Sequence, residues 1–200
     1  MRKEYGKALR ELFTARMKAD FPEWRPVSAP KQWYWPGERV FVQDSYPGVW
    51  LVVVLVPDLK DHDAFYVEIG WSIHKRVPEL SMRPCPDDPR SEAALNRDEY
   101  LCSLGELIPG GDKLHGDVHG WVIDHRTFSV DSGEILTALL ERQTRLGAEQ
   151  ARAAVSPFVD NAIAALAEYG VPYLKSRLSL LAERRSNTLL NSDAQKPPAG

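Results

Sequence analysis

The sequence predicts one α+β domain, in which an antiparallel sheet of about four to six strands packs against an N-terminal helix and C-terminal helices. Three observations lead to this prediction. An amphipathic segment opens the chain, strand-like segments joined by short turns follow between Gln32 and Ile73, and helical periodicity dominates after Asp131. The chain has 200 residues, of which 44% are apolar, and this is sufficient to bury one hydrophobic core.

Residues 2–20 are expected to form the first helix. Tyr5, Leu9 and Phe13 recur at four-residue spacing, which places them on one face of that helix. Pro22 ends the helix, because its ring cannot continue the hydrogen-bond ladder and also restricts the preceding residue.

The segment 32–73 is expected to form most of the sheet. The aromatic stretch QWYW (32–35) opens it, and further strands are expected at 38–44, 49–56 and 64–73. Apolar and polar residues alternate along the last of these, so that strand has one buried face and one wetter face. Short turns between the strands predict an antiparallel meander.

Two further segments belong to the expected sheet region. Residues 99–108 (EYLCSLGELI) fit either a strand or a helix, because a short apolar run does not separate the two. Trp121 to Ile123 predict a brief last strand. Ahead of both, SEAALNRDEY (91–100) is expected to hold a helical turn.

The C-terminal third is expected to be helical. Pro157 predicts a kinked helix or two helices, and Gly170-Val171-Pro172 predicts that one helix stops and another starts. In that interpretation Gly170 adopts the left-handed conformation that ends many helices. The ordered domain is expected to span residues 1–185, and the polar residues 186–200 are expected to form a disordered tail.

Composition excludes several classes of protein. A net charge of −3 argues against a nucleic-acid binder that works through bulk electrostatics. The apolar run at 49–56 is far shorter than the roughly 20 residues that span a bilayer. Cys85 and Cys102 lack the spacing of a metal or redox motif, and so few cysteines predict a reducing compartment. We therefore expect a cytoplasmic protein without a membrane partner.

The segment HGDVHGWVIDH (115–125) holds three of the five histidines. Its GDVHG portion resembles the first motif of the calcineurin-like metallophosphatases, and that resemblance implies that Asp117 and His119 bind one metal of a dinuclear pair. The family also needs later histidine ligands, and this sequence contains none after His125. A two-metal site therefore cannot be assembled.

A mononuclear site is the remaining metal hypothesis. In an extended segment His115 and His119 lie about 13 Å apart, whereas zinc holds histidine nitrogens at about 2.0 to 2.1 Å. The glycines at 116 and 120 allow a bend, but they equally account for a loop that binds nothing. We expect no cofactor, with zinc or manganese only under the alternative that the chain is a metal-dependent hydrolase. The candidate ligands are His115, Asp117 and His119, together with Asp124 and His125.

A second acidic patch contains Asp58, Asp61, His62 and Asp63. Aspartates in a connection between strands are expected for turn geometry alone. The patch would favour an enzyme only if His62 or Asp63 met His119 in space.

Consecutive aromatic residues at Trp33, Tyr34 and Trp35 have two interpretations. They cover part of a sheet face, or they form an exposed contact surface for a partner, since Trp and Tyr dominate interface energetics. Clustered exposed aromatics need an explanation that isolated ones do not. These three residues are therefore the candidate partner-binding residues.

Four stretches of the chain form a recognisable pattern: the N-terminal helix that runs into Phe21-Pro22, VEIGWS (67–72) followed by Arg76-Val77-Pro78, LGELIPGGD (104–112) and EYGVPYL (168–174). In these stretches the chain resembles an uncharacterised bacterial family of domains of unknown function. The resemblance implies an α+β domain without established catalytic residues, and by analogy it points to bacterial toxin–immunity or defence genes.

These observations favour a non-enzymatic protein-binding module, and the resemblance extends this to a bacterial immunity or defence-system accessory protein. The expected partner is another protein, nucleic acid is disfavoured, and the alternative function is the metal-dependent hydrolase. No Gly-x-Ser-x-Gly nucleophile elbow and no Gly-rich phosphate loop occur in the sequence.

Overall fold

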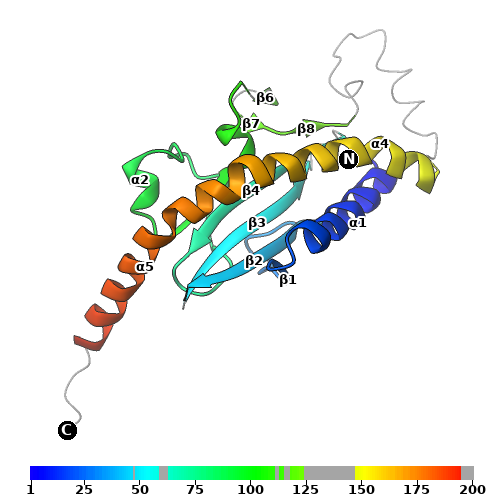
Figure 1. The fold of residues 1–200 in the computed structure, drawn as a ribbon. Coiled ribbons are helices and arrows are strands. Elements are labelled where there is room, and N and C mark those ends of the chain that lie inside the picture. Colours follow the sequence, from blue (N-terminus) through cyan, green and yellow to red (C-terminus); the bar gives the residue numbers. More distant parts are fainter. Residues whose placement is uncertain (47, 59–62, 111–112, 115–117, 124–146, 195–200) are drawn as a thin grey trace.

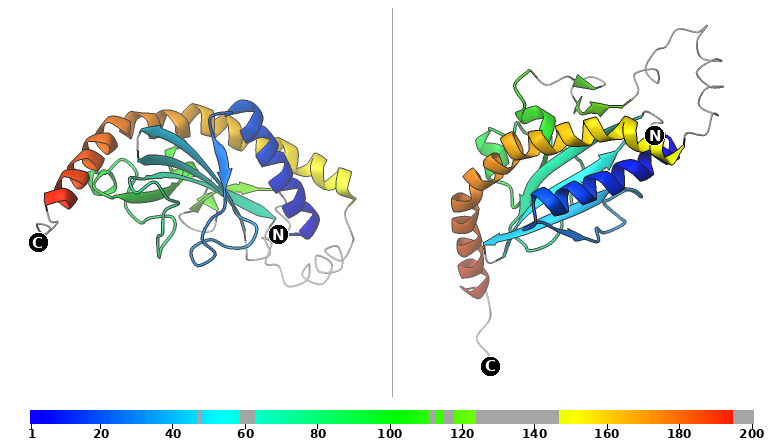
Figure 2. Two further views of the ribbon diagram at one scale, coloured as in Figure 1. Left: turned by 90° about the horizontal axis from the view of Figure 1, so that it is seen from below. Right: turned by 45° about the vertical axis from the view of Figure 1, so that its right-hand side comes forward.

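The computed structural model describes residues 1–46, 48–58, 63–110, 113–114, 118–123 and 147–194. A six-stranded antiparallel sheet lies at its centre, with helices on one face and loops on the other (Figures 1 and 2). The predicted α+β architecture is therefore confirmed, including the N-terminal helix and the C-terminal helices that pack on the sheet.

Five strands follow one another across the sheet in sequence order, each antiparallel to its neighbour. β8 (Trp121–Val122) pairs with one end of β4, and β5 pairs with the other end. Because β3 lies along the opposite side of β4, strands β5 and β8 share one edge. A separate ladder joins β6 (Lys113–Leu114) to β7 (Val118–His119). The five consecutive strands are β1 (Arg25–Val27), β2 (Arg39–Tyr46), β3 (Val49–Pro57), β4 (Ala64–Ser72) and β5 (Glu99–Ser103).

The prediction of a strand at QWYW is wrong, although the predicted meander of β2, β3 and β4 is confirmed. The backbone N–H groups of Trp33 and Tyr34 both donate to the Pro30 carbonyl, at 3.0 and 3.1 Å, and this closes a turn. A second turn follows at Pro36 and Gly37, where Gly37 has a φ of 104° that favours glycine. The chain therefore doubles back before it enters β2.

Helix α1 (Lys3–Asp20) ends just before Phe21-Pro22, as predicted. Helix α4 (Ala148–Ala165) passes through Pro157 and runs through a single π-helical turn, η3 (Leu166–Gly170), into α5 (Val171–Ala194). Figure 1 shows them as one continuous helix that crosses the sheet. The ambiguous segment 99–108 contains both β5 and a short 3₁₀ helix, η1 (Leu104–Leu107), and the expected helical turn is α2 (Glu92–Leu95).

The predicted stop and restart at Gly170 is wrong. Gly170 has no positive φ, and the N–H of Val171 donates to the Leu166 carbonyl, which is the longer hydrogen bond of a π turn. The glycine is needed for close packing instead. A Cβ atom at Gly170 would lie 2.8 Å from Leu166 Cδ1 and 3.0 Å from Leu104 Cδ1, so its absence lets the helix approach η1.

Helix α5 continues to Ala194, beyond the predicted domain boundary at residue 185. The sequence has no glycine or proline between Pro172 and Pro197, so nothing in it interrupts the helical hydrogen bonds. Residues 195–200, and the start of the helix predicted from Asp131, lie outside the described residues.

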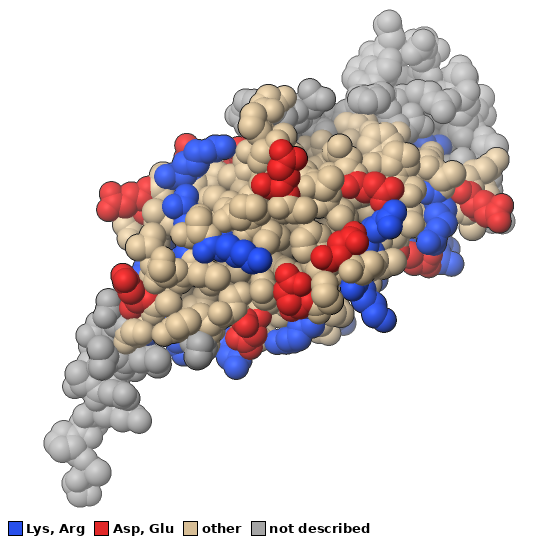
Figure 3. All heavy atoms as spheres, in the orientation of Figure 1, with Lys and Arg blue, Asp and Glu red and all other residues tan. Residues whose placement is uncertain are grey.

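The helix-bearing face carries both signs of charge, with Lys and Arg interspersed among Asp and Glu (Figure 3). It therefore presents no large field of one sign. In the described part of the chain, no helix has the length and apolar composition needed to cross a bilayer.

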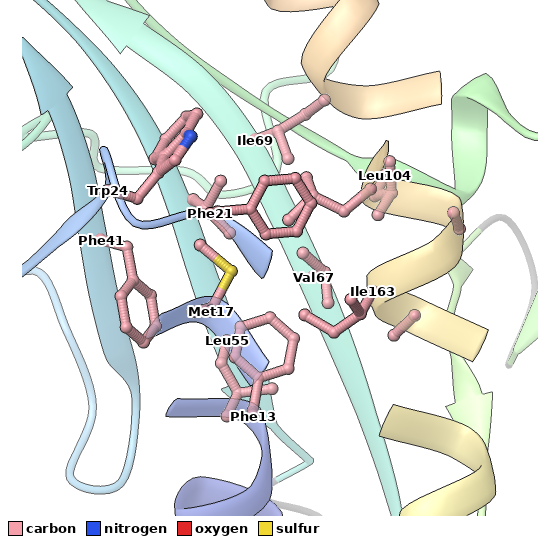
Figure 4. Close-up of a cluster of buried hydrophobic side chains, with 14 of the residues drawn as sticks. Phe13, Met17, Phe21, Trp24, Phe41, Leu55, Val67, Ile69, Leu104 and Ile163 are labelled. Atoms are coloured by element: carbon pink, nitrogen blue, oxygen red, sulfur yellow. The ribbon is translucent and has the colours of Figure 1, made fainter. Parts of the chain in front are cut away.

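The main core lies between the sheet and the helices (Figure 4). Phe13 and Met17 of α1 and Ile163 of α4 point toward the sheet and are almost completely buried. Burying one such side chain stabilises the fold by about 1.5 to 3 kcal/mol. The sheet residues labelled in Figure 4 that meet them are Phe41, Leu55, Val67 and Ile69.

A smaller core lies on the opposite face of the sheet. Loop residues Tyr34 and Val77 pack there against strand residues. Strand β3 is therefore buried on both faces, which explains its nearly continuous apolar sequence. The strand residues of this second core are Val40, Val42, Val52, Val54 and Leu101.

We predict that Gly70→Ala lowers the free energy of unfolding by about 1 to 3 kcal/mol, because the added methyl group overpacks the β4–β5 ladder. A Cβ atom at Gly70 would lie 1.8 Å from the Tyr100 carbonyl oxygen, which is backbone and cannot move freely. Gly6→Ala is the control, since there the nearest atom is the flexible end of Arg10 and the helix gains propensity. Chemical denaturation measures both; equal stability of the two variants would contradict the packing argument.

Candidate functional site

Two irregular segments cover the second face of the sheet: residues 28–38, between β1 and β2, and residues 74–91, after β4. We call this side the loop face (Figure 2, left). Irregular segments bury few apolar side chains of their own, so polar contacts have to fix their position. On the loop face those contacts converge on one arginine.

Arg83 of segment 74–91 donates hydrogen bonds to three residues, one on strand β4 and two on segment 28–38. Its Nε donates to Glu68 Oε2 of β4 at 3.0 Å, and its Nη2 lies 2.9 Å from both carboxylate oxygens of Glu38. Its Nη1 donates to the Trp33 carbonyl at 3.0 Å. One guanidinium therefore joins segment 74–91, the aromatic turn and strand β4.

Tyr34 completes this arrangement, which we call the Arg83 cluster: Arg83, Glu38, Glu68 and Tyr34. The guanidinium lies over the Tyr34 ring, 4.0 Å from its centroid, and the Tyr34 hydroxyl donates to the Pro78 carbonyl at 2.8 Å. The cluster is closed to solvent, because the side chains of Arg83, Glu38 and Glu68 are only 8%, 3% and 6% exposed. Burial strengthens both the ion pairs and the cation–π contact.

Two buried carboxylates share one cation in this cluster, and loss of solvation raises the pKa of each although Arg83 opposes the rise. Loss of solvation raises the pKa of Glu68 to about 7, and the nearby Glu38 charge adds to the rise while Arg83 opposes it. Burial also raises the pKa of Glu38, against the effect of Arg83. The pair therefore retains a proton closer to neutrality than isolated glutamates do.

The charged groups of the Arg83 cluster are engaged with one another, although Tyr34 and Glu38 also contribute to the lining of a neighbouring pocket. Both Glu38 oxygens and one Glu68 oxygen are engaged by Arg83, and solvent hardly reaches either side chain. A general acid or base needs hydrogen-bond reach to a substrate. What the cluster does is hold the aromatic turn in one conformation.

A pocket of about 730 Å³ opens beside this turn, between segment 28–38 and the paired ends of β1 and β2. This volume is in the usual range of small-ligand and peptide-binding pockets. Its lining combines aromatic, charged and apolar side chains. Among the lining residues are Val27, Lys31, Tyr34, Trp35, Glu38 and Arg39.

The structure separates the three candidate partner-binding residues. Tyr34 is buried under Arg83 and Trp33 is half-buried against the second core, whereas Trp35 is 63% exposed at the pocket. Met82, next to Arg83 in sequence, is also 63% exposed. Of the three aromatics, Trp35 alone presents most of its surface to a partner.

No pattern in the sequence predicted that Glu38, Glu68 and Arg83 interact with one another. The alternation of β4 places Glu68 on the face opposite Phe65 and Val67, but this pattern describes any half-exposed strand. Arg83 stands in a proline-rich loop, and no spacing rule links it to a glutamate 45 residues earlier. The one feature of the sequence that points to the cluster is the charged residue Glu68 within a largely apolar strand.

The proposed metal ligands fall largely outside the described residues. His115, Asp117, Asp124 and His125 are among the residues not described, and of His119 the structure describes only the backbone, which pairs with Lys113 in the β6–β7 ladder. No group of three or more potential metal ligands occurs within the described ranges.

The second acidic patch has a structural role where it is described. Asp63 is buried and accepts hydrogen bonds from Arg2, one from the backbone N–H and one from Nε, both at 2.7 Å. Asp58 accepts a hydrogen bond from the Tyr66 hydroxyl at 2.9 Å. The Asp63 carboxylate thus connects the start of the chain to the β3–β4 hairpin, and the Asp58 carboxylate forms a bond within that hairpin. Asp61 and His62 lie outside the described residues.

Comparisons with protein families, curated proteins and solved structures find no match for this chain. The resemblance to the bacterial family of unknown function therefore stays a prediction, and the function has to be argued from the loop face.

We predict that Arg83→Met lowers the free energy of unfolding by about 3 to 5 kcal/mol, because it leaves two buried carboxylates without their cation. Arg97→Met is the matched control: Arg97 forms an ion pair with Asp87 that is far more exposed, and such pairs contribute about 1 kcal/mol or less. Urea denaturation at neutral pH measures both. Similar losses in the two variants would show that the Arg83 cluster does not hold the loops.

Glu68 predicts a specific pH dependence of stability. Its pKa is raised from 4.5 to about 7 in the folded state, so the folded protein binds the proton more tightly than the unfolded chain does. This contribution is fully present below pH 4.5 and is lost as the pH rises toward 7. Glu68→Gln should therefore gain about 1 to 3 kcal/mol relative to the wild type between about pH 5 and about pH 8.

Glu99→Gln provides the control for this measurement. Arg76 and Ser72 lower the pKa of Glu99, so its titration lies below that of a free glutamate. The difference in free energy of unfolding between Glu99→Gln and the wild type should therefore stay constant over the same pH range. A difference between Glu68→Gln and the wild type that also stays constant with pH would contradict a raised pKa of Glu68 in the folded protein.

Proposed function

We propose that this protein is a non-enzymatic protein-binding module whose contact surface is Trp35 with the pocket beside it, which we call the Trp35 surface. The observation that supports this most directly is the 63% exposure of Trp35 on a turn whose neighbours are fixed by Arg83. A large aromatic side chain facing solvent on a rigid support is the usual form of an interface hot spot.

The Arg83 cluster is expected to raise the affinity of the Trp35 surface for a partner, because it fixes the turn before the partner binds. Binding normally costs free energy to order flexible loops, and a turn held in advance avoids much of that cost. Arg83 already holds the two residues before Trp35. It donates a hydrogen bond to the Trp33 carbonyl, and its guanidinium lies over the Tyr34 ring. Only the Trp35 side chain remains to be buried by the partner.

The bacterial family resemblance extends this proposal to an accessory protein of immunity or defence systems in the cytoplasm. The alternative, a metal-dependent hydrolase, rests on His115, Asp117 and His119, and no observation on the described residues favours it. We therefore propose the binding module alone.

The test is a pull-down from the native host with the full chain and with Trp35→Ala. We expect the variant to lose a specific protein, with binding weaker by about 2 kcal/mol, or roughly thirtyfold, as for other tryptophan hot spots. Tyr46→Ala is the matched control, because Tyr46 is an aromatic residue 43% exposed at the far end of β2. The melting temperature of Trp35→Ala should be unchanged. Equal recovery of the partner by the wild type, Trp35→Ala and Tyr46→Ala would contradict the proposal.

A further inference from the structure

The charges around the pocket are unequal. Lys31 and Arg39 both line it, both side chains are exposed, and within the described ranges neither forms an ion pair with a carboxylate. Among the described residues, the side chain of Arg39 donates only to the backbone carbonyl of Glu38, at 2.9 Å. Two cations at one pocket are therefore available to an anion.

The acidic residue of the pocket lining does not balance them. Glu38 is 3% exposed, and both of its carboxylate oxygens lie 2.9 Å from Arg83 Nη2. Its charge is paired with the Arg83 guanidinium. The pocket consequently keeps the positive charge of Lys31 and Arg39.

Arg10 of helix α1 lies near the turn but does not line the pocket. Its Nη1 is 3.6 Å from the position that a Cβ atom would take on Gly37, between Trp35 and β2. Lys31 and Arg39 are therefore the cations that the pocket lining provides.

We propose that the pocket receives an acidic segment of the partner protein, in which Asp or Glu side chains flank an apolar residue. The carboxylates pair with Lys31 and Arg39, and the apolar residue packs on the exposed Trp35 ring. This inference rests on the proposed function and names the chemistry of the partner. Charge complementarity also sets partner choice, because a basic segment would be repelled at the same place.

The experiment measures fluorescence anisotropy of labelled short peptides added to the full chain. Three peptide sets place one Leu, Pro or Phe among acidic, basic or neutral residues. We expect the acidic set alone to bind, and its affinity to fall as salt is raised. The double variant Lys31→Glu with Arg39→Glu should weaken that binding by at least about tenfold.

The matched control is Arg152→Glu with Lys175→Glu. Both residues are exposed on α4 and α5, on the helix-bearing face, and the change in net charge is the same. This control should bind the acidic set like the wild type. Equal losses in both double variants would assign the effect to net charge and overturn the proposal.

Three other outcomes would also overturn it: no acidic peptide binds, neutral peptides bind as tightly, or a short single-stranded DNA binds more tightly. The last would assign the pocket to nucleic acid. If the protein captured by the wild type depends on Trp35 but still binds the Lys31→Glu, Arg39→Glu variant, the binding module stands and only the acidic segment is excluded. If capture is independent of Trp35, the proposed function itself fails.

Discussion

The loop face depends on one buried cation shared by two buried carboxylates. Arg83 supplies donors from all three guanidinium nitrogens, and they reach Glu68 on β4, Glu38 ahead of β2 and the Trp33 carbonyl. Burying an ion pair costs desolvation energy, which is repaid only when the geometry is good and the hydrogen bonds are complete. Here a single side chain connects its own segment to two others, and so it orders two loops that contain little regular structure. A hydrophobic contact could stabilise the same region, but it would not dictate which backbone groups meet.

This cluster explains why the two faces of the sheet differ. On the helix-bearing face, stripes of apolar residues on α1 and α4 meet the apolar side of the strands, and hydrophobic packing forms most of this contact. On the loop face, Val40, Val54 and Glu68 lie side by side across three strands. Glu68 accepts the hydrogen bond from Arg83 that attaches the loops to the sheet. The turn fastened there buries Tyr34 and leaves Trp35 exposed at the pocket. The same constraint therefore shapes the fold and the surface proposed for binding.

Local patterns in the sequence predicted most of the fold. Helix α1, the β2–β4 meander and the C-terminal helices α4 and α5 follow from hydrophobic periodicity, because each element must bury one stripe or face. The errors occur where distant contacts override local preference. QWYW has the composition of a strand, but the Pro30 carbonyl and Arg83 hold it as a turn. Gly170 has the sequence context of a helix end, but its lack of a side chain serves contact with Leu104.

The sequence by itself determined the class of the fold, the order of its main elements and the presence of an aromatic cluster that needs explanation. These depend on period, composition and turn residues, which are properties of neighbouring positions along the chain. Only the tertiary structure decided which aromatic residue is exposed, which carboxylates are buried and which cations remain around the pocket. Trp33, Tyr34 and Trp35 are equivalent as a pattern, and they differ because Arg83, some 50 residues later, contacts two of them and leaves the third exposed. Contacts between residues so far apart in sequence have no local period, so the chain has to fold before they exist.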